Sequence, residues 1–309
     1  MAEPVTEPKV SGSSSSLRER REDAAGAANR AIKGMPTLAV FLFLVVMTGY
    51  FLAPIWWLVV ASTKSQGDLY SGFVLWFSRV QLTDNLGALF ARDGGIYARW
   101  LLNSLAYCGA AASVGTVISA LAGYGLAKFD FPGRGVAFGI ILGGVLVPAT
   151  ALALPLFLLF SSLGITNSVL AVVLPSVVNP FGVYLARIYA SSAIPDEIIE
   201  AARIDGAGEA RIFFGVVWRM MTPALGTIFL FQLVATWNNY LLPLLMLQDR
   251  DLFPVTLGLA QWNTQFIQDP SLQVLTIVGS FVSIIPLTIA FLALQRYWRS
   301  GLAIGSVTG

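Results

Sequence analysis

The chain has 309 residues, of which 56% are hydrophobic and 12% charged, and its mean hydropathy is +0.73. Soluble domains carry about 25% charged residues, so this composition excludes an ordinary water-facing surface and predicts an all-α integral membrane protein. There is no histidine and a single cysteine, Cys108, which excludes an imidazole base, a histidine-ligated metal and an intrachain disulfide. We therefore predict no catalytic residue and no metal site.

Windows without Asp, Glu, Lys or Arg predict the membrane spans. A span needs about 20 apolar residues. The sequence has five such windows. Four of them hold one helix each, and the fifth, the 52-residue window at 135–186, holds two, separated by a turn-like segment at 164–167. Buried helices of a large soluble protein, the alternative, rarely run so long without a charge. We expect six transmembrane helices, near 38–61, 100–127, 136–161, 167–188, 224–247 and 272–295.

The segment before the first span is polar and contains four consecutive serines at 13–16. Its composition predicts that residues 1–34 form a disordered cytoplasmic tail. The polar stretch is too long for a signal peptide, since the apolar run begins only at Thr37. Residues 35–309 are then expected to form the transmembrane domain.

Basic residues predict the orientation, because cytoplasmic segments of membrane proteins carry an excess of Lys and Arg. The two terminal segments and the loops at 128–134 and 187–219 hold 14 of the 19 basic residues, and the opposite segments hold five. Both termini, and the loop between the fourth and fifth spans, are therefore expected in the cytoplasm.

The segment 187–222 between those two spans predicts a helical hairpin. Pro195 favours the first turn of a helix, and the two acidic residues after it suit the positive end of the helix dipole. Gly206 can adopt the left-handed conformation that ends a helix. Apolar residues then recur at three- and four-residue spacing over 212–220, which predicts a second, amphipathic helix. By pattern alone, the hairpin fits a membrane-surface anchor equally well.

The residues of this hairpin carry a family resemblance. Glu200-Ala-Ala-Arg-Ile-Asp205-Gly206-Ala207, with Phe213 and Pro223 downstream, resembles the EAA motif of the inner-membrane permeases of ABC importers. Three further stretches are similar to the carbohydrate-uptake, maltose-permease-like branch of this binding-protein-dependent transport family: 237–244 (WNNYLLPL), 253–259 (FPVTLGL) and the C-terminal end from Gln295. The resemblance covers about residues 38–309. Arg219 departs from it, standing where the family commonly has a proline.

The resemblance implies a permease subunit of an ATP-binding-cassette importer in a bacterial inner membrane. With a second, homologous permease it would form the translocation path for a sugar or related polyol. The sequence has no GxxxxGK[ST] phosphate loop, so the chain is expected to be no enzyme and to bind no cofactor. ATP and Mg²⁺ would bind to two partner ATPase subunits, and an extracytoplasmic solute-binding protein would deliver the solute. Membrane lipid is a further expected partner, and nucleic acid is not.

The same resemblance assigns roles to the hairpin. The loop 189–222 would carry a coupling helix that docks on an ATPase subunit, with Glu200 pairing with a basic group there. The two alanines would allow close approach, and the Asp-Gly pair would hold the turn. The residues expected to couple the chain to the ATPase are Glu200, Ala201, Ala202, Asp205, Gly206 and Ala207.

Polar residues inside the spans are candidates for the solute path, because such residues usually face the bundle interior or a wet cavity. Neutral amides donate and accept hydrogen bonds and suit a neutral hydroxylated solute. The alternative is that these amides join helices to one another. The path residues we expect are Asn179, Gln232, Asn238 and Asn239, with Asn103 and Thr236 as weaker candidates.

Two other functions fit a polytopic chain. A stand-alone secondary transporter of a small neutral solute would want an internal repeat or an ionisable coupling site within the membrane. Apart from Arg187 at the very end of the fourth span, the predicted spans contain no acidic or basic residue, and no repeat is evident. A membrane enzyme would need a set of catalytic side chains, and the composition does not provide one. An ATPase partner that co-purifies would favour the importer.

Overall fold

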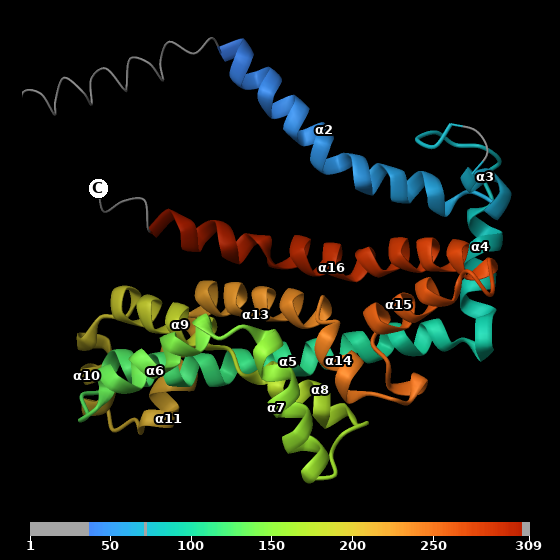
Figure 1. Cartoon of the computed structure of the whole chain (residues 1–309). Helices are drawn as coiled ribbons and strands as arrows, with labels where there is room; N and C mark the ends of the chain where they lie inside the picture. The colour runs from blue at the N-terminus through green and yellow to red at the C-terminus, as the bar shows by residue number, and fades with distance from the viewer. Residues whose placement is uncertain (1–36, 71–72, 305–309) are drawn as a thin grey trace, which may run out of the picture. The chain divides into compact units, whose positions relative to one another are not determined.

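The computed structural model describes residues 37–70 and 73–304, and the predicted N-terminal tail lies outside them (Figure 1). The secondary structure of the described residues is entirely helical, as the composition predicted. The chain divides into two compact units, Met1–Trp57 and Leu58–Gly309. Apart from most of α2, the elements discussed below lie in the second unit.

The helices follow one another with short connections. They are α2 (Thr37–Ser62), α3 (Gln66–Tyr70), α4 (Leu82–Ala91), η1 (Arg92–Gly94), α5 (Ile96–Lys128), α6 (Arg134–Leu146), α7 (Ala149–Ser162), α8 (Val169–Val177), α9 (Pro180–Ala193), α10 (Asp196–Ile204), α11 (Glu209–Ile212), the π-helical η2 (Phe213–Val217), α12 (Trp218–Met220), α13 (Thr222–Trp237), α14 (Leu241–Met246), η3 (Arg250–Leu252), α15 (Val255–Gln265) and α16 (Ser271–Ile304).

Four helical stretches among the described residues are long and apolar enough to cross a bilayer: Ala39–Ser62, Ile96–Lys128, Val169–Ala193 and Ser271–Gln295. Two further pairs of helices pass the same test together but are sharply bent at their junctions. By length and composition, the part of the chain that the structure describes therefore has four spans, or up to six if each bent pair is one span.

The spans are less continuous than the charge-free windows suggested. Within 136–161, α6 and α7 meet at 101°, because Pro148 cannot donate a helical hydrogen bond and forces Val147 into an extended conformation. Pro180 likewise follows a break between α8 and α9 at Val178 and Asn179. Within 224–247, α13 ends at Trp237, and the short helix α14 follows after Asn238–Tyr240.

The long helix α5 is central to the second unit, and it packs most extensively against α9 and α13 (Figure 1). Its contact with α8 and α9 is made by small residues spaced four apart. A Cβ on Gly115 would lie 2.9 Å from the carbonyl oxygen of Val177, and one on Gly123 would lie 2.4 Å from the Cβ of Ala186. Between them, the Ser119 hydroxyl donates to the Asn179 carbonyl. Small residues at this spacing let two membrane helices approach closely.

Ion pairs connect segments at the η1 end of α5. Arg92 pairs with Asp269 at 2.7 Å, Arg250 with Asp93 at 3.1 Å, and Arg99 with Asp251 at 2.7 Å. Hydrogen bonds from Ser271 and Arg92 lower the pKa of the Asp269 carboxyl, so this group stays ionised at neutral pH. These pairs join η1 and α5 to η3 and to the start of α16.

Candidate functional site

The predicted hairpin exists, and a glycine closes its first helix. Gly206 has a φ of +79°, in the left-handed region. The amide of Ala207 donates to the carbonyl of Ala202, and the amide of Gly206 donates to that of Arg203, both at 3.0 Å. This pair of bonds is the Schellman motif, which satisfies carbonyls that the end of a helix would leave unpaired. The Arg203 guanidinium, whose pKa is raised by its hydrogen bond to Glu209, bridges the turn at 2.7 Å.

One face of α10 is buried and the other is free. Ile199 is only 3% exposed and packs inward, whereas Glu200, Ala201, Asp205 and Gly206 are exposed, and Ala202 and Ala207 are half-buried. Ile204, beside the turn, is 86% exposed. A large apolar side chain therefore lies exposed at the tip of the hairpin.

The second half of the hairpin is helical but not uniform. It is predicted as one amphipathic helix, but α11 passes through the π-helical segment η2 before α12. The helix axis then bends by 82° into α13. Thr222-Pro223 supplies the first turn of α13. Arg219 lies in α12, one turn before Pro223.

The hairpin packs on the membrane helices as one apolar cluster. Ile199 of α10 and Ile212, Phe213 and Val217 of the second half are all buried against side chains of α5, α9 and α13. Tyr124 of α5 contacts Phe213 with ring centroids 5.4 Å apart. A displacement of the hairpin would therefore be transmitted to these three helices, because a close-packed core does not deform locally.

Two of the predicted path residues hold the break in the α8–α9 span. The side chain of Asn179 caps α9 by accepting a hydrogen bond from the amide of Gly182 at 2.8 Å. Gln232 of α13 is buried, and its side-chain amide donates to the carbonyl of Ser176. Both amides therefore satisfy backbone groups that the interrupted helix would leave unpaired within the bilayer.

The other two predicted path residues follow the end of α13. Asn238 is exposed, and its Nδ2 donates to the carbonyl of Val234 one turn earlier at 3.0 Å. The Oδ1 of Asn239 accepts from the amide of Leu242 at 3.3 Å and so starts α14. Asn103 donates to the carbonyls of Asp251 and Phe253, which joins α5 to η3.

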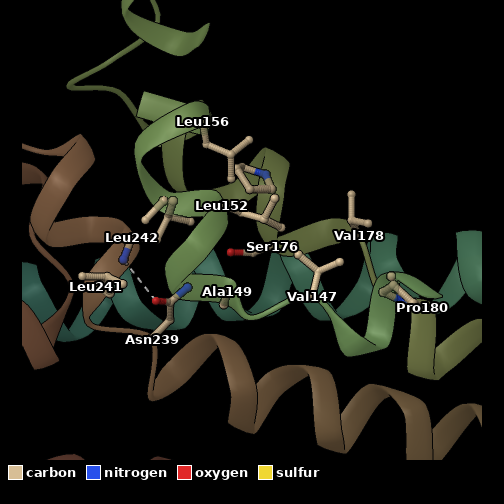
Figure 2. A pocket seen from close by; sticks show the side chains of 13 residues that line it. Val147, Ala149, Leu152, Leu156, Ser176, Val178, Pro180, Asn239, Leu241 and Leu242 are labelled. Atoms are coloured by element: carbon tan, nitrogen blue, oxygen red, sulfur yellow. Dashed lines mark hydrogen bonds between the residues drawn. The ribbon is translucent and has the colours of Figure 1, made fainter. Parts of the chain in front are cut away.

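Asn239 also lines a cavity of about 490 Å³ between the bent α6–α7 pair, the α8–α9 break and α14. Figure 2 shows its side chain at one edge of the cavity and Ser176 in the middle, among apolar side chains. The other labelled lining residues are Val147, Ala149, Leu152, Leu156, Val178, Pro180, Leu241 and Leu242. The breaks between α6 and α7, between α8 and α9, and between α13 and α14 all contribute to this cavity.

Sequence reasoning missed the stripe Gly115, Ser119 and Gly123, although its four-residue spacing is visible in the sequence. It also treated Lys128 only as a positive charge for the orientation. In the structure the Lys128 side chain is 7% exposed and bonded to the start of the hairpin. Within residues 37–70 and 73–304, no group of three or more His, Cys, Asp or Glu residues could hold a metal ion.

Comparison with known proteins gives consistent relatives. A family profile described as "Binding-protein-dependent transport system inner membrane component" matches residues 115–302. The arabinooligosaccharides transport system permease protein AraQ of Bacillus subtilis (strain 168) is 35% identical over 275 residues, covering 88% of this chain and 96% of that protein. The lactose transport system permease protein LacG of Rhizobium radiobacter is 30% identical over 254 residues, covering 82% and 90%.

A solved structure shares the fold. It belongs to a bacterial ABC transporter involved in the import of the acidic polysaccharide alginate. The two chains superpose with a TM-score of 0.74 at 23% sequence identity, covering 88% of this chain and 98% of that one.

Proposed function

The chain belongs to the family of binding-protein-dependent transport system inner membrane components, and we propose that it is the permease subunit of an ATP-driven importer for a sugar or related polyol. The relatives named for arabinooligosaccharide and lactose transport support this substrate class. The neutral lining of the cavity is consistent with it, since Asn239 and Ser176 are its polar members.

The observation that carries the coupling role is the hairpin tip. The Schellman turn fixes α10 as a short, rigid helix, and its exposed face presents Glu200, Ala201 and Ile204. Burying Ile204 against an ATPase subunit would remove apolar surface from water, which is worth up to about 1.5–3 kcal/mol for such a side chain. The Glu200 carboxylate would add a charge-assisted hydrogen bond to a basic partner group.

In this role the hairpin 189–222 receives the movement of an ATPase and passes it to the membrane helices. The contact residues are Glu200, Ala201, Ala202, Asp205, Gly206 and Ala207. The buried cluster beneath them supports the proposal, because it joins α10 to α5, α9 and α13 without a flexible linker.

The complex around this chain follows from the same role. A second, homologous permease would complete the translocation path, and two ATPase subunits would bind ATP and Mg²⁺ and hydrolyse ATP. An extracytoplasmic binding protein would supply the solute. The chain itself would be no enzyme, and it would lie in the bacterial inner membrane with both termini in the cytoplasm, in agreement with the distribution of basic residues.

For the solute path, we propose Asn239 as a direct contact, because it lines the cavity. The predicted contributions of Asn179 and Gln232 would be indirect, since their amides hold the backbone around the break in the α8–α9 span. Asn238 is exposed outside the lining of this cavity, where it could meet the second permease.

Purification and reconstitution test the proposal. The tagged chain, expressed in its native host, should co-purify with a second permease and an ATPase. Liposomes that contain this complex and the binding protein should accumulate sugar only when ATP is present on the side of the membrane that carries the ATPase subunits. Radiolabelled arabinotriose, lactose and raffinose are suitable probes. Sugar uptake by liposomes that contain this chain alone and no ATP would contradict the proposal and favour a secondary transporter.

A further inference from the structure

Lys128, the last residue of α5, has a nearly buried side chain although it lies at the polar end of a membrane helix. Its side chain is 7% exposed. The Nζ donates to the carbonyl oxygen of Ile194 at 2.5 Å and to Oδ1 of Asp196 at 2.7 Å. Both acceptors are more than 60 residues away in sequence, so the contact joins two separate parts of the chain.

The two acceptors mark the junction between the α9 span and the helix α10. Ile194 caps the C-terminus of α9, and its carbonyl precedes Pro195. Asp196 is the first residue of α10. One ammonium group thus holds a C-terminal carbonyl of one helix and an acidic residue at the N-terminus of the next. The ammonium suits the negative, C-terminal end of the α9 dipole, and the Asp196 carboxylate suits the positive, N-terminal end of the α10 dipole.

The ion pair alone would contribute little, because the Asp196 side chain is 74% exposed and exposed pairs are weak. The bond to the Ile194 carbonyl differs, since it comes from a desolvated ammonium and fixes the backbone at the hinge between α9 and α10. The other contacts between α10 and the end of α5 are the apolar packing of Ile199, which has no fixed direction, and the Arg203 guanidinium over the Phe129 ring, 5.8 Å from its centroid.

We propose that Lys128 is a positioning residue that locks the direction of α10 to that of α5, so that a movement of the docked hairpin turns α5 rather than bending the α9–α10 junction. This inference rests on the proposed coupling role of the hairpin. Because α5 packs against both α9 and α13, its rotation would reach the cavity lined by Leu241 and Asn239.

The test measures how ATP changes the cavity. A complete complex with its binding protein carries Leu241→Cys as a reporter at the cavity and Cys108→Ala to remove the native thiol. The rate of labelling by a water-soluble maleimide is compared with and without ATP and vanadate, and ATP hydrolysis is measured on the same samples. With Lys128 present, ATP and vanadate should change the labelling rate at least threefold.

In Lys128→Gln we expect ATP hydrolysis within twofold of the parent, but at least two-thirds of the change in labelling rate lost, and Lys128→Arg should restore at least half of it. Asp196→Asn keeps the bond to Ile194 and should give a smaller loss. Lys128→Met keeps the length of the buried side chain but has no hydrogen-bond donor, so it should lose the same share of the change and tests the proposal if Lys128→Gln does not assemble. Arg134→Gln is the matched control, since Arg134 pairs at 2.7 Å with Asp130 of its own loop.

An unchanged response to ATP in Lys128→Gln or in Lys128→Met would overturn the proposal. The proposal would also be overturned if Lys128→Gln reduced the ATP-dependent change in labelling, the rate of ATP hydrolysis and the amount of assembled complex by the same proportion. That result would describe a residue needed only for folding. Failure of the proposed function itself gives a different result: the parent complex would contain no ATPase, or its labelling rate would not respond to ATP.

Discussion

At the scale of single residues, the hairpin turn depends on one backbone conformation. Gly206 occupies a φ of +79°, where an L side chain costs roughly 1–2 kcal/mol. A Cβ at this position would nevertheless meet no atom within 4 Å, so the chain itself has space for a side chain there. The requirement for glycine is therefore set by the backbone and by whatever covers the exposed turn.

We expect Gly206→Asp to abolish uptake while the chain is still inserted in the membrane. The substitution strains the turn and places a second carboxylate next to Asp205 on the face proposed to dock. The measurements are sugar uptake, membrane abundance by immunoblot, and the amount of ATPase that co-purifies.

Gly208→Ala is the control for this experiment. Gly208 lies two residues away in an ordinary conformation with a φ of −72°, and a Cβ there also meets nothing within 4 Å. Its uptake should stay close to that of the parent. Normal uptake by Gly206→Asp at normal abundance would rule out the docking role of the turn.

At the scale of helices, the close approach of α5 to α8 and α9 organises the second unit. Gly115, Ser119 and Gly123 form one stripe, and each touches or nearly touches the opposing helices. Membrane helices gain little from the hydrophobic effect against each other, since lipid is equally apolar, so their association depends on such close packing.

Gly123→Val should therefore separate α5 from α9. Its Cβ would lie 2.4 Å from that of Ala186 and 2.7 Å from the backbone nitrogen of Arg187, and overpacking of this kind costs typically 1–3 kcal/mol. Thermal unfolding of the detergent-solubilised protein, followed by tryptophan fluorescence, should show a lowered midpoint.

Gly125→Ala provides the comparison, because it lies on the same helix and an added Cβ there meets nothing within 4 Å. Alanine also favours the helix by up to about 1 kcal/mol relative to glycine. Its unfolding midpoint should match or exceed that of the parent. Equal midpoints for the two variants would show that the α5–α9 contact is looser than described.

At the scale of the whole molecule, the proposed orientation places the hairpin and the ion pairs near η1 on opposite sides of the membrane. The hairpin is at the Lys128 end of α5, and Arg92–Asp269 and its neighbouring pairs are at the other end. Since α5 spans 33 residues, about 50 Å of helix separates the two ends.

Cysteine labelling in intact cells tests this orientation. In a Cys108→Ala background, Thr264→Cys on α15 should react with a membrane-impermeant maleimide from outside, and Ser192→Cys at the end of α9 should react only after the cells are opened. Both side chains are exposed, so neither substitution disturbs the core. The opposite labelling pattern would invert the topology and place the hairpin outside the cytoplasm.

The sequence alone determined the features that depend on near neighbours in the chain. Helical class follows from long charge-free windows, and the turn after Asp205 follows from a glycine that the local hydrogen bonds require. The breaks at Pro148 and Pro180 also have local causes, but charge-free windows do not predict them, because apolar composition continues through a kink.

Tertiary structure decided what the polar residues do. Gln232 bonds a carbonyl 56 residues away, and Lys128 one 66 residues away, so no local pattern could distinguish these bonds from a solute contact or a solvated charge. Asn239 was predicted together with Gln232, but of the four path candidates it is the one that lines the cavity. The physical reason is that an unpaired polar group is costly in the bilayer, and only the packing of distant helices decides which partner satisfies it.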